Sequence, residues 1–212
     1  MNTRLLIVRH GQTAWNADGR FMGQRDVPLD ETGRAQAMAV ARRLADERPA
    51  TIYSSDLVRA RDTARAIQES IASRPELKLE PRLREMSFGD WQGKTYAEIR
   101  ETDPVGLARW ESEQFSMAPP KGETLMTFAG RIRAAYQEIC AAHPEQTVIV
   151  VAHGGSLQVL IALALGLAPE AFQRLRLSNA SLSDLRIYDT GAILYLLNDT
   201  SHLSATMSQA TA

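Results

Sequence analysis

The chain has 212 residues, of which 44% are hydrophobic, so it can bury a full core as one domain or as a domain with an insertion. Lysine and arginine number 24 and acidic residues 25, for a net charge of -1, which leaves no overall basic field to attract nucleic acid or an anionic membrane. The single cysteine, Cys140, excludes an internal disulfide and is typical of a reducing compartment. The N-terminus lacks a signal-peptide core, and the apolar run at 157–167 is too short to span a bilayer, so we expect a cytoplasmic protein.

Short β-branched or leucine-rich runs alternate with longer alanine-rich stretches along the chain, a pattern typical of an α/β fold. In chain order, the predicted strands are residues 3–8, 51–53, 77–79 at an edge, 147–152, and 182–188 with 193–197 as a hairpin. Apolar stripes at helical spacing predict helices at residues 32–46, 56–71, 124–142 and 155–165. We therefore expect a three-layer sandwich with a mainly parallel central sheet, helices on both faces and an inserted cap segment.

Residues 88–120 form a segment of a different kind, with weak periodicity and a Pro119-Pro120 pair. We interpret the segment as an insertion over one end of the sheet that faces the ligand site. Its tryptophans, Trp91 and Trp110, are candidates for lining that site, whereas Trp15 is assigned to packing. The residues after Asp199 are expected to form a loose tail, and residues 1–212 as a whole to form a single domain.

Two predicted strands end on a histidine followed by glycine. The first junction reads Arg9-His10-Gly11 and the second His153-Gly154-Gly155. Ligands of open α/β sheets bind at the carboxyl ends of strands, and backbone N–H groups at the start of the next helix favour an anion such as phosphate. The alternative is that His153 is a structural histidine, that the glycines only form a turn, and that the first strand exits into a polar loop.

Two arginines, Arg59 and Arg61, lie just past the predicted strand at 51–53. A guanidinium group offers a planar fork that matches two phosphate oxygens and keeps its charge. The alternative is an exposed helix arginine paired with Asp56 or Asp62, which is a common and energetically slight arrangement. The position relative to the strand favours contact with an anion at the same edge of the sheet.

Four segments together resemble one protein family. They are residues 5–16 (LLIVRHGQTAWN), 23–29 (GQRDVPL), 54–60 (SSDLVRA) and 152–155 (AHGG). In this order they resemble the histidine phosphatase superfamily, in its phosphoglycerate-mutase-like branch, and within it the α-ribazole phosphatase or broad-specificity type. The resemblance runs from about Arg4 to Asn198. It implies a phosphomonoesterase for small phosphorylated metabolites that needs no metal and no other cofactor, and related enzymes are often homodimers.

The resemblance also implies a role for each matched residue. His10 is the expected nucleophile that takes up the phosphoryl group, and the rest of the phosphate pocket comprises Arg9, Arg59 and His153. The expected substrate-binding residues are Asn16, Gly23, Gln24 and Gly154. The physical chemistry agrees, because neighbouring cations keep an imidazole neutral and hence nucleophilic. Several fixed cations also make a metal ion optional for phosphoryl transfer.

Breaking a phosphate ester requires a proton for the leaving oxygen, and a carboxyl group suits this task. Residues 83–93 resemble the acid segment of the family, which implies that Glu85 is the general acid. Without the resemblance, Glu85 would read as a solvated loop carboxylate. Glu123 lies in another segment that resembles the family, and we assign it to the first turn of the helix that follows.

Departures from the family pattern separate a phosphatase from a mutase. Mutases typically follow the acid glutamate with an arginine and an aromatic pair ending in tyrosine, where this chain has Met86-Ser87-Phe88, and they carry a hydroxyl residue in place of Met22. Without groups that hold phosphoglycerate, the phosphohistidine is expected to react with water. Gln158 replaces an arginine common after the second histidine motif. The alternatives are a cofactor-dependent mutase and a non-catalytic module that binds a phosphorylated ligand.

Other motifs fail on spacing. The segment 89–95 (GDWQGKT) has three residues between its glycines where a P-loop requires four. Cys140 is followed six residues later by Gln146, where a cysteine phosphatase would need arginine, so we assign Cys140 to the core. His143 and His202 do not pair with other candidate ligands at zinc spacing. We therefore expect no metal site, no nucleic-acid partner and no membrane partner.

Overall fold

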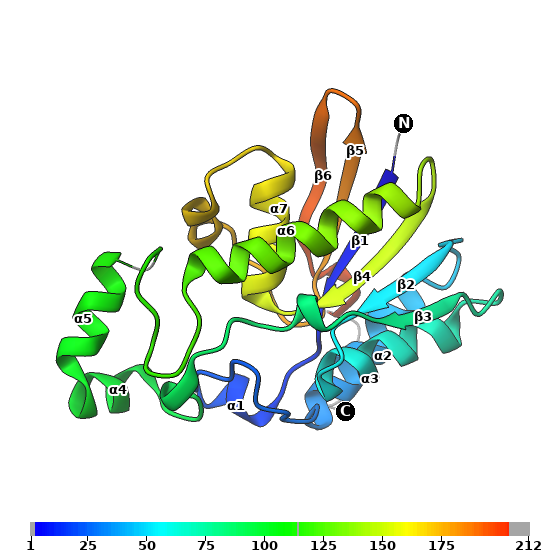
Figure 1. Cartoon of the computed structure of the whole chain (residues 1–212). Coiled ribbons are helices and arrows are strands. Elements are labelled where there is room, and N and C mark those ends of the chain that lie inside the picture. The colour runs from blue at the N-terminus through cyan, green and yellow to red at the C-terminus, as the bar shows by residue number, and fades with distance from the viewer. Residues whose placement is uncertain (1–2, 114, 204–212) are drawn as a thin grey trace.

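A six-stranded sheet forms the centre of the computed structural model, which describes residues 3–113 and 115–203 (Figure 1). The strands are β1 (Thr3–Arg9), β2 (Thr51–Ser54), β3 (Glu76–Leu79), β4 (Thr147–Ala152), β5 (Leu182–Tyr188) and β6 (Gly191–Asp199). They lie in the order β3-β2-β4-β1-β5-β6, in which the first four pair in parallel, β5 pairs antiparallel with β1, and β6 pairs antiparallel with β5. The predicted mainly parallel sheet, its edge strand β3 and the β5–β6 hairpin are confirmed.

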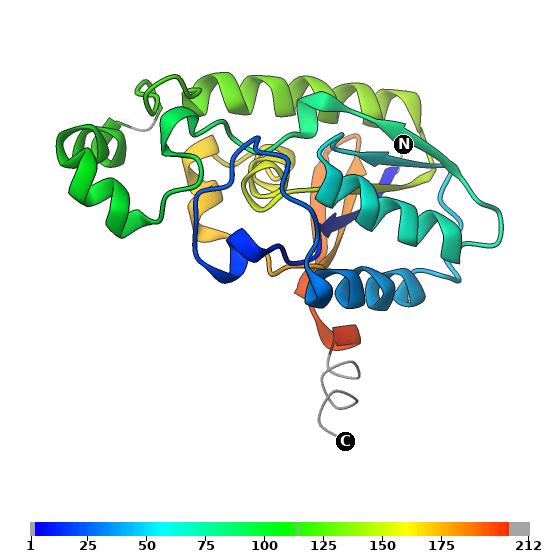
Figure 2. The ribbon, with the colours of Figure 1, turned by 90° about the horizontal axis from the view of Figure 1, so that it is seen from below.

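The helices are α1 (Ala14–Ala17), α2 (Glu31–Arg43), α3 (Val58–Ser70), α4 (Tyr96–Thr102), α5 (Pro104–Glu113), α6 (Leu125–Ala142) and α7 (Gly154–Ala164). Short 3-10 turns are η1 (Pro81–Leu83), η2 (Gly89–Trp91), η3 (Pro169–Arg174) and η4 (Ser201–Leu203). Figure 2 shows α6 on one side of the sheet and α2 with α3 on the other. The predicted three-layer arrangement is therefore present.

Alternating side chains of the central strands explain why the sheet is covered on both faces. Leu5 of β1 and Val148 of β4 pack against α6 and α7, whereas their neighbours Leu6 and Ile149 pack against α2 and α3. β4 is fully enclosed from Val148 onward, as its continuous apolar run predicts. The two cores hold the carboxyl ends of β1 and β4 rigidly side by side.

Capping residues set the helix boundaries and account for their small differences from the predictions. The Asp30 side chain accepts a hydrogen bond from the Gly33 N–H, so α2 begins at Glu31. The Thr124 side chain likewise accepts from the Thr127 N–H, so α6 begins one residue later than predicted. α2 ends at Arg43 rather than at residue 46, because the chain turns there.

The segment 88–120 contains η2, α4 and α5, which the sequence did not predict as helices (Figure 1). Trp91, Ile99 and Leu107 form a small separate core within it. Ile99 is the one buried residue of α4 and Leu107 that of α5, so neither helix carries an apolar stripe. Figure 1 shows α4 and α5 at one side of the molecule, away from the sheet. We call this segment the cap.

The chain after Asp199 begins with an ordered turn rather than with the expected loose tail. In η4 the His202 ring nitrogen Nε2 donates to the Ala180 carbonyl at 2.9 Å, and Leu203 packs against the core on the α2–α3 side. The rest of the predicted tail, residues 204–212, lies outside the described residues. Among the helices that the structure describes, none has the length and apolar character needed to cross a membrane.

Candidate active site

Parallel pairing of β1 and β4 brings the two histidine junctions together. Arg9 lies opposite Ala152 in the register of the two strands, so His10 and His153 follow adjacent strand ends. Their ring centroids are 5.1 Å apart with an interplanar angle of 62°, and both side chains are buried. The expected meeting of the two junctions at one edge of the sheet is therefore present in the structure.

The His10 ring is held in one tautomer. Its Nδ1 atom lies 2.6 Å from the carbonyl oxygen of Gly11, and because a carbonyl only accepts, Nδ1 must carry the proton. Burial, and then the charges of Arg59 and Arg9, lower the pKa of His10 well below its ordinary value of 6.5. The ring is therefore neutral near pH 7, with the lone pair of Nε2 available.

Arg59 lowers the pKa of His10 more than Arg9 does. Its guanidinium donates to the carbonyl oxygens of Arg25 and Gly23, both at 2.8 Å. Burial lowers the pKa of Arg59 to about 10, although Glu85 and Asp26 act in the opposite direction, so it remains a cation at neutral pH. The buried Nε atom of Arg59 has no hydrogen-bond partner among the described residues.

Gly23 supports Arg59 through its backbone and does not line the cavity beside His10. Its φ angle is +53°, in the left-handed region that favours glycine. A Cβ atom at this position would lie 2.1 Å from Oε1 of Gln92. Only glycine fits here, so Gly23 positions Arg59 without a side chain of its own.

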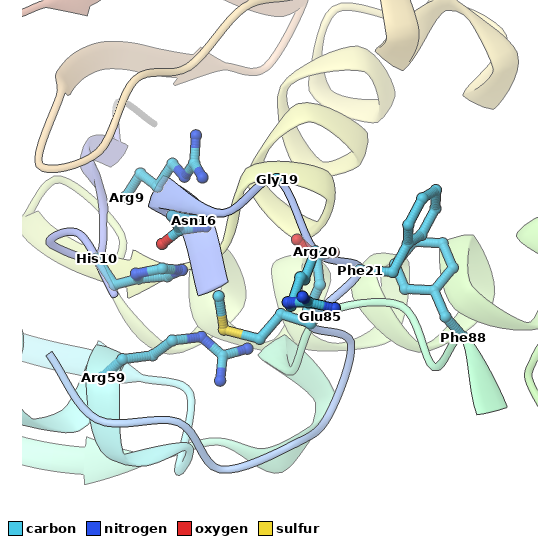
Figure 3. Close-up of a pocket in the computed structure, with 10 residues that line it drawn as sticks. Arg9, His10, Asn16, Gly19, Arg20, Phe21, Arg59, Glu85 and Phe88 are labelled. Carbon is cyan, nitrogen blue, oxygen red and sulfur yellow. The ribbon is translucent and has the colours of Figure 1, made fainter. Parts of the chain in front are cut away.

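Arg9 lies on the opposite side of His10 from Arg59 (Figure 3). It donates from Nη1 to the Leu177 carbonyl at 2.6 Å, while its buried Nε atom has no partner in the described part of the chain. Burial lowers the pKa of Arg9, and Glu85 acts in the opposite direction. A Cβ atom at Gly154 would lie 3.6 Å from the Nε atom, so the first residue of α7 packs against this guanidinium.

His153 caps the start of α7, and only one of its ring nitrogens is satisfied. Nε2 lies 2.8 Å from the Ser55 hydroxyl oxygen, whereas the buried Nδ1 atom has no partner among the residues described. Burial, followed by Arg59, His10 and Arg9, lowers the pKa of His153 well below 6.5. Ser55, which sequence reasoning did not single out, thus orients the second histidine.

Glu85 is anchored rather than loosely solvated. Its Oε2 atom accepts the Gly155 N–H at 2.9 Å, and its Oε1 atom accepts the Met86 N–H at 2.9 Å. A Cβ atom at Gly155 would lie only 2.4 Å from Oε1. The absence of a side chain at Gly155 therefore permits the close approach of this carboxyl group to the start of α7.

Arg131 of α6 holds the Glu85 segment from behind, and sequence reasoning missed it. Its guanidinium donates to the carbonyl oxygens of Arg82, Arg84 and Glu85 at 2.7, 2.6 and 2.8 Å. It also pairs with the Glu123 carboxylate at 2.6 Å, and Glu123 in turn accepts the Ser87 N–H. The expected place of Glu123 in the first helical turn is wrong, because this residue precedes the Thr124 cap and binds Arg131 instead.

The two amide candidates occupy different places. Oδ1 of Asn16 accepts from the Thr13 N–H at 3.1 Å and from Nδ2 of Asn179 at 3.2 Å, which leaves the Asn16 NH2 group as a donor at the cavity that it lines. Gln24 instead donates to the Glu85 carbonyl at 3.2 Å and is not part of the cavity lining. Arg61 pairs with Asp62 at the surface, as the alternative interpretation expected.

A cavity of about 280 Å³ opens at these groups (Figure 3). Its lining comprises Arg9, His10, Asn16, Gly19, Arg20, Phe21, Met22, Arg59, Glu85 and Phe88. The two buried guanidinium groups of Arg9 and Arg59, an amide donor and a neutral imidazole suit a phosphate dianion, and the Glu85 carboxyl group lies at the same cavity. We call this cavity the phosphate cavity. No cluster of three or more metal-ligating side chains occurs within the described residues.

The other residues that the sequence offered for chemistry or substrate contact are packed or hydrogen-bonded away from the phosphate cavity. Cys140 of α6 packs against the hydrophobic core, and burial raises the pKa of its thiol to about 11. His143 lies within hydrogen-bond distance of Tyr53 and Gln146. Trp91 is buried and donates to Asp103, so it belongs to the core of the cap.

A neutral imidazole between two guanidinium groups at the carboxyl ends of parallel strands is suited to phosphoryl transfer on an α/β fold. The chain belongs to the histidine phosphatase superfamily (branch 1), whose family model matches residues 5–200. It is a phosphatase, a hydrolase of phosphoric monoesters.

Similar proteins come from several organisms. The metal-independent phosphoserine phosphatase of Arabidopsis thaliana is 39% identical over 205 residues, which cover 96% of this chain and 84% of that protein. The glucosyl-3-phosphoglycerate phosphatase of Mycobacterium tuberculosis is 40% identical over 172 residues, which cover 77% of this chain and 76% of that protein. The structure of the α-ribazole phosphatase of Shigella flexneri superposes with a TM-score of 0.86 at 28% identity, covering 92% of this chain and 96% of that one.

Proposed function

We propose that this phosphatase hydrolyses phosphate monoesters of small metabolites without a metal ion, through a phosphohistidine on Nε2 of His10. The observation that carries the proposal is the neutral His10 ring, whose Nδ1 atom donates to Gly11 while Arg9 and Arg59 lie on either side. The same two cations that keep the ring neutral offer their charge to the phosphoryl oxygens.

In the first step, Nε2 of His10 attacks phosphorus, and the N–P bond forms as the bond from phosphorus to the leaving oxygen breaks. Arg9, Arg59 and the Asn16 amide bind the phosphoryl oxygens, with His153 beside them. Glu85, which must hold a proton for this step, transfers it to the leaving oxygen so that an alcohol departs. The anchored position of Glu85 at the rim of the phosphate cavity supports this role.

In the second step, the Glu85 carboxylate takes a proton from a water molecule as the oxygen of that water attacks phosphorus. The N–P bond breaks, inorganic phosphate leaves, and His10 returns to its neutral form while Glu85 is protonated again. Because one carboxyl group serves both steps, no further acid or base is required. Since the fixed cations carry the electrostatic stabilisation, no step calls for a metal ion.

The substrates named for the similar proteins support a small phosphorylated metabolite as substrate. Those names are phosphoserine, glucosyl-3-phosphoglycerate and α-ribazole phosphate. The cap, an insertion into a single domain, contributes Phe88 to the phosphate cavity, and we propose that it selects among such metabolites.

A metal-chelated assay on a panel of phosphate monoesters tests this function, with the native protein compared to His10→Ala. We expect hydrolysis by the native protein without isomerisation and loss of turnover in the variant. Label trapped from a phosphorylated substrate should be acid-labile and base-stable, as a phosphoramidate is. Unchanged activity of His10→Ala would refute the mechanism, and isomerisation of phosphoglycerate would favour a mutase.

We also propose a homodimer and a cytoplasmic location. The outer strand β6 exposes Ile193, Tyr195 and Leu197 on one side, which supports an interface between two copies. The single cysteine supports a reducing compartment. Light scattering during size-exclusion chromatography tests the dimer, and a monomer at micromolar concentration would contradict it.

A further inference from the structure

A second cavity of about 290 Å³ adjoins the phosphate cavity. Glu85 and Phe88 line both of them. The general acid of the proposed mechanism must reach the oxygen between phosphorus and the leaving group, so the leaving group must extend past Glu85. The second cavity begins at that residue, and we call it the leaving-group cavity.

We propose that the leaving-group cavity binds an uncharged, carbon-rich alcohol portion of the substrate, and that it disfavours leaving groups that carry a carboxylate. This inference rests on the proposed function and defines its substrate class more narrowly. It therefore sets this protein apart from enzymes whose phosphorylated substrates are carboxylic acids, such as phosphoserine.

The lining of the leaving-group cavity is apolar except at a few positions. Aromatic rings come from four separate parts of the chain, namely Phe88, Trp110, Phe128 and Phe172. Phe88 and Trp110 pack edge to face with centroids 6.2 Å apart. Such rings favour contact with carbon surfaces of a ligand.

Among the residues that the structure describes, Glu85 is the one ionisable side chain in this lining. A substrate carboxylate would therefore lose water without gaining a cation, and it would lie near Glu85 as that residue becomes negative. The buried Nε1 atom of Trp110 has no partner among the described residues. A neutral acceptor such as a hydroxyl or ether oxygen would suit that donor.

Besides Arg9 and Arg59, which face the phosphate, Arg131 and Arg20 lie near the cavities, and each of these two already has acceptors. Arg131 stacks on Phe128 with 4.7 Å between the guanidinium carbon and the ring centroid. Its nitrogens already bind Glu123 and three carbonyl oxygens. Arg20 lines the phosphate cavity, where it pairs with Glu98 at 2.9 Å and donates to the Gly93 carbonyl.

Gln158 is the position at which this selectivity can be changed. It lies on α7 in the lining of the leaving-group cavity, and its amide NH2 group donates to the Leu175 carbonyl at 2.6 Å. An arginine here would bring a cation to the cavity. The exposed Gln137 on α6 offers a matched control, because Gln137→Arg adds the same charge outside the cavity.

The test compares benzyl phosphate with 4-carboxybenzyl phosphate, whose leaving alcohols have similar acidity. We expect kcat/KM of the native protein to be at least about 10-fold higher for benzyl phosphate. This is the factor that the cost of burying one uncompensated polar group corresponds to. Gln158→Arg should shift this ratio by about 10-fold toward the carboxylated ester, and Gln137→Arg should leave it unchanged. Equal or higher kcat/KM of the native protein for the carboxylated ester would overturn the inference.

Affinities of the two corresponding benzylphosphonates, measured by calorimetry, read out the same selectivity without turnover. Tighter binding of the phosphonate that lacks the carboxylate supports the inference even if the phosphohistidine mechanism fails. A preference for the carboxylated phosphonate that Arg20→Gln removes would overturn it, because the leaving group would then bind at Arg20. Loss of hydrolysis in all assays with retained phosphonate selectivity would refute only the proposed function.

Discussion

Replacement of Gly155 by alanine should disable the proposed general acid while leaving the fold intact. The new Cβ atom would lie 2.4 Å from Oε1 of Glu85, and ordinary contact begins near 3.4 Å, so the carboxyl group must shift by about 1 Å. The atom that must move ends a side chain and is not part of the backbone, and Gly155 lies in the first turn of α7 with no positive φ angle. The variant should therefore keep the stability of the native protein.

The catalytic effect should depend on the leaving group. A displacement of about 1 Å of a reacting group can lower the rate about 100-fold, equivalent to about 2.7 kcal/mol of transition-state stabilisation. We expect kcat for an alkyl phosphate to fall by about this factor in Gly155→Ala. The loss for p-nitrophenyl phosphate should stay within about 3-fold, because its leaving group hardly needs a proton. Glu85→Gln should show the same contrast.

The assay is steady-state hydrolysis of both esters, together with thermal unfolding. Gly130→Ala is the matched control, because Gly130 lies exposed on α6 and a Cβ atom there would meet nothing within 4 Å. The control should keep native kinetics and melt about 2–4 °C higher. Equal losses on the two esters in Gly155→Ala, or native rates on the alkyl ester, would refute the placement of Glu85 as the acid.

Two further predictions concern pH and the support of Glu85. The pKa of His10 is lower in the folded protein than in the unfolded chain. The unfolded chain therefore binds more protons below about pH 6.5. The free energy of unfolding should be highest above that pH and decrease as the pH falls through it. His10→Asn should lose less stability than the native protein between about pH 7 and pH 5, and an identical loss measured by thermal unfolding would contradict this. Glu123→Gln weakens the ion pair that holds Arg131 behind the Glu85 segment. Turnover of an alkyl phosphate should therefore fall about 10-fold, and turnover of p-nitrophenyl phosphate much less. An equal loss on both esters would instead indicate a general structural defect.

Local patterns in the chain were sufficient to predict the sheet and the two histidine junctions. The apolar runs of β1 and β4 each end on a histidine, and parallel pairing of such runs brings their carboxyl ends to one edge. The helices of the cap could not be predicted in this way. α4 and α5 each bury a single residue, Ile99 and Leu107, so no apolar stripe marked them.

The contacts that hold the Glu85 segment in place could not be predicted from local sequence patterns either. Arg131 binds carbonyl oxygens 46 to 49 residues earlier in the chain, and no spacing in the sequence indicates that contact. For the same reason Glu123 was assigned to the helix that follows rather than to Arg131. Sequence reasoning placed Gln24 among the substrate contacts, whereas its side chain binds the Glu85 backbone in the structure.

The sequence by itself determined the strands, the helices that flank the sheet, and the family, and it singled out Arg9, His10, Arg59 and His153, which the structure brings together. These properties follow from local periodicity and from motifs of adjacent residues. Only the tertiary structure decided the tautomer of His10, the anchoring of Glu85 at Gly155, and the aromatic cavity beyond Glu85. Each of these depends on distances of a few ångströms between segments far apart in the chain, and packing of the two cores and the cap sets those distances.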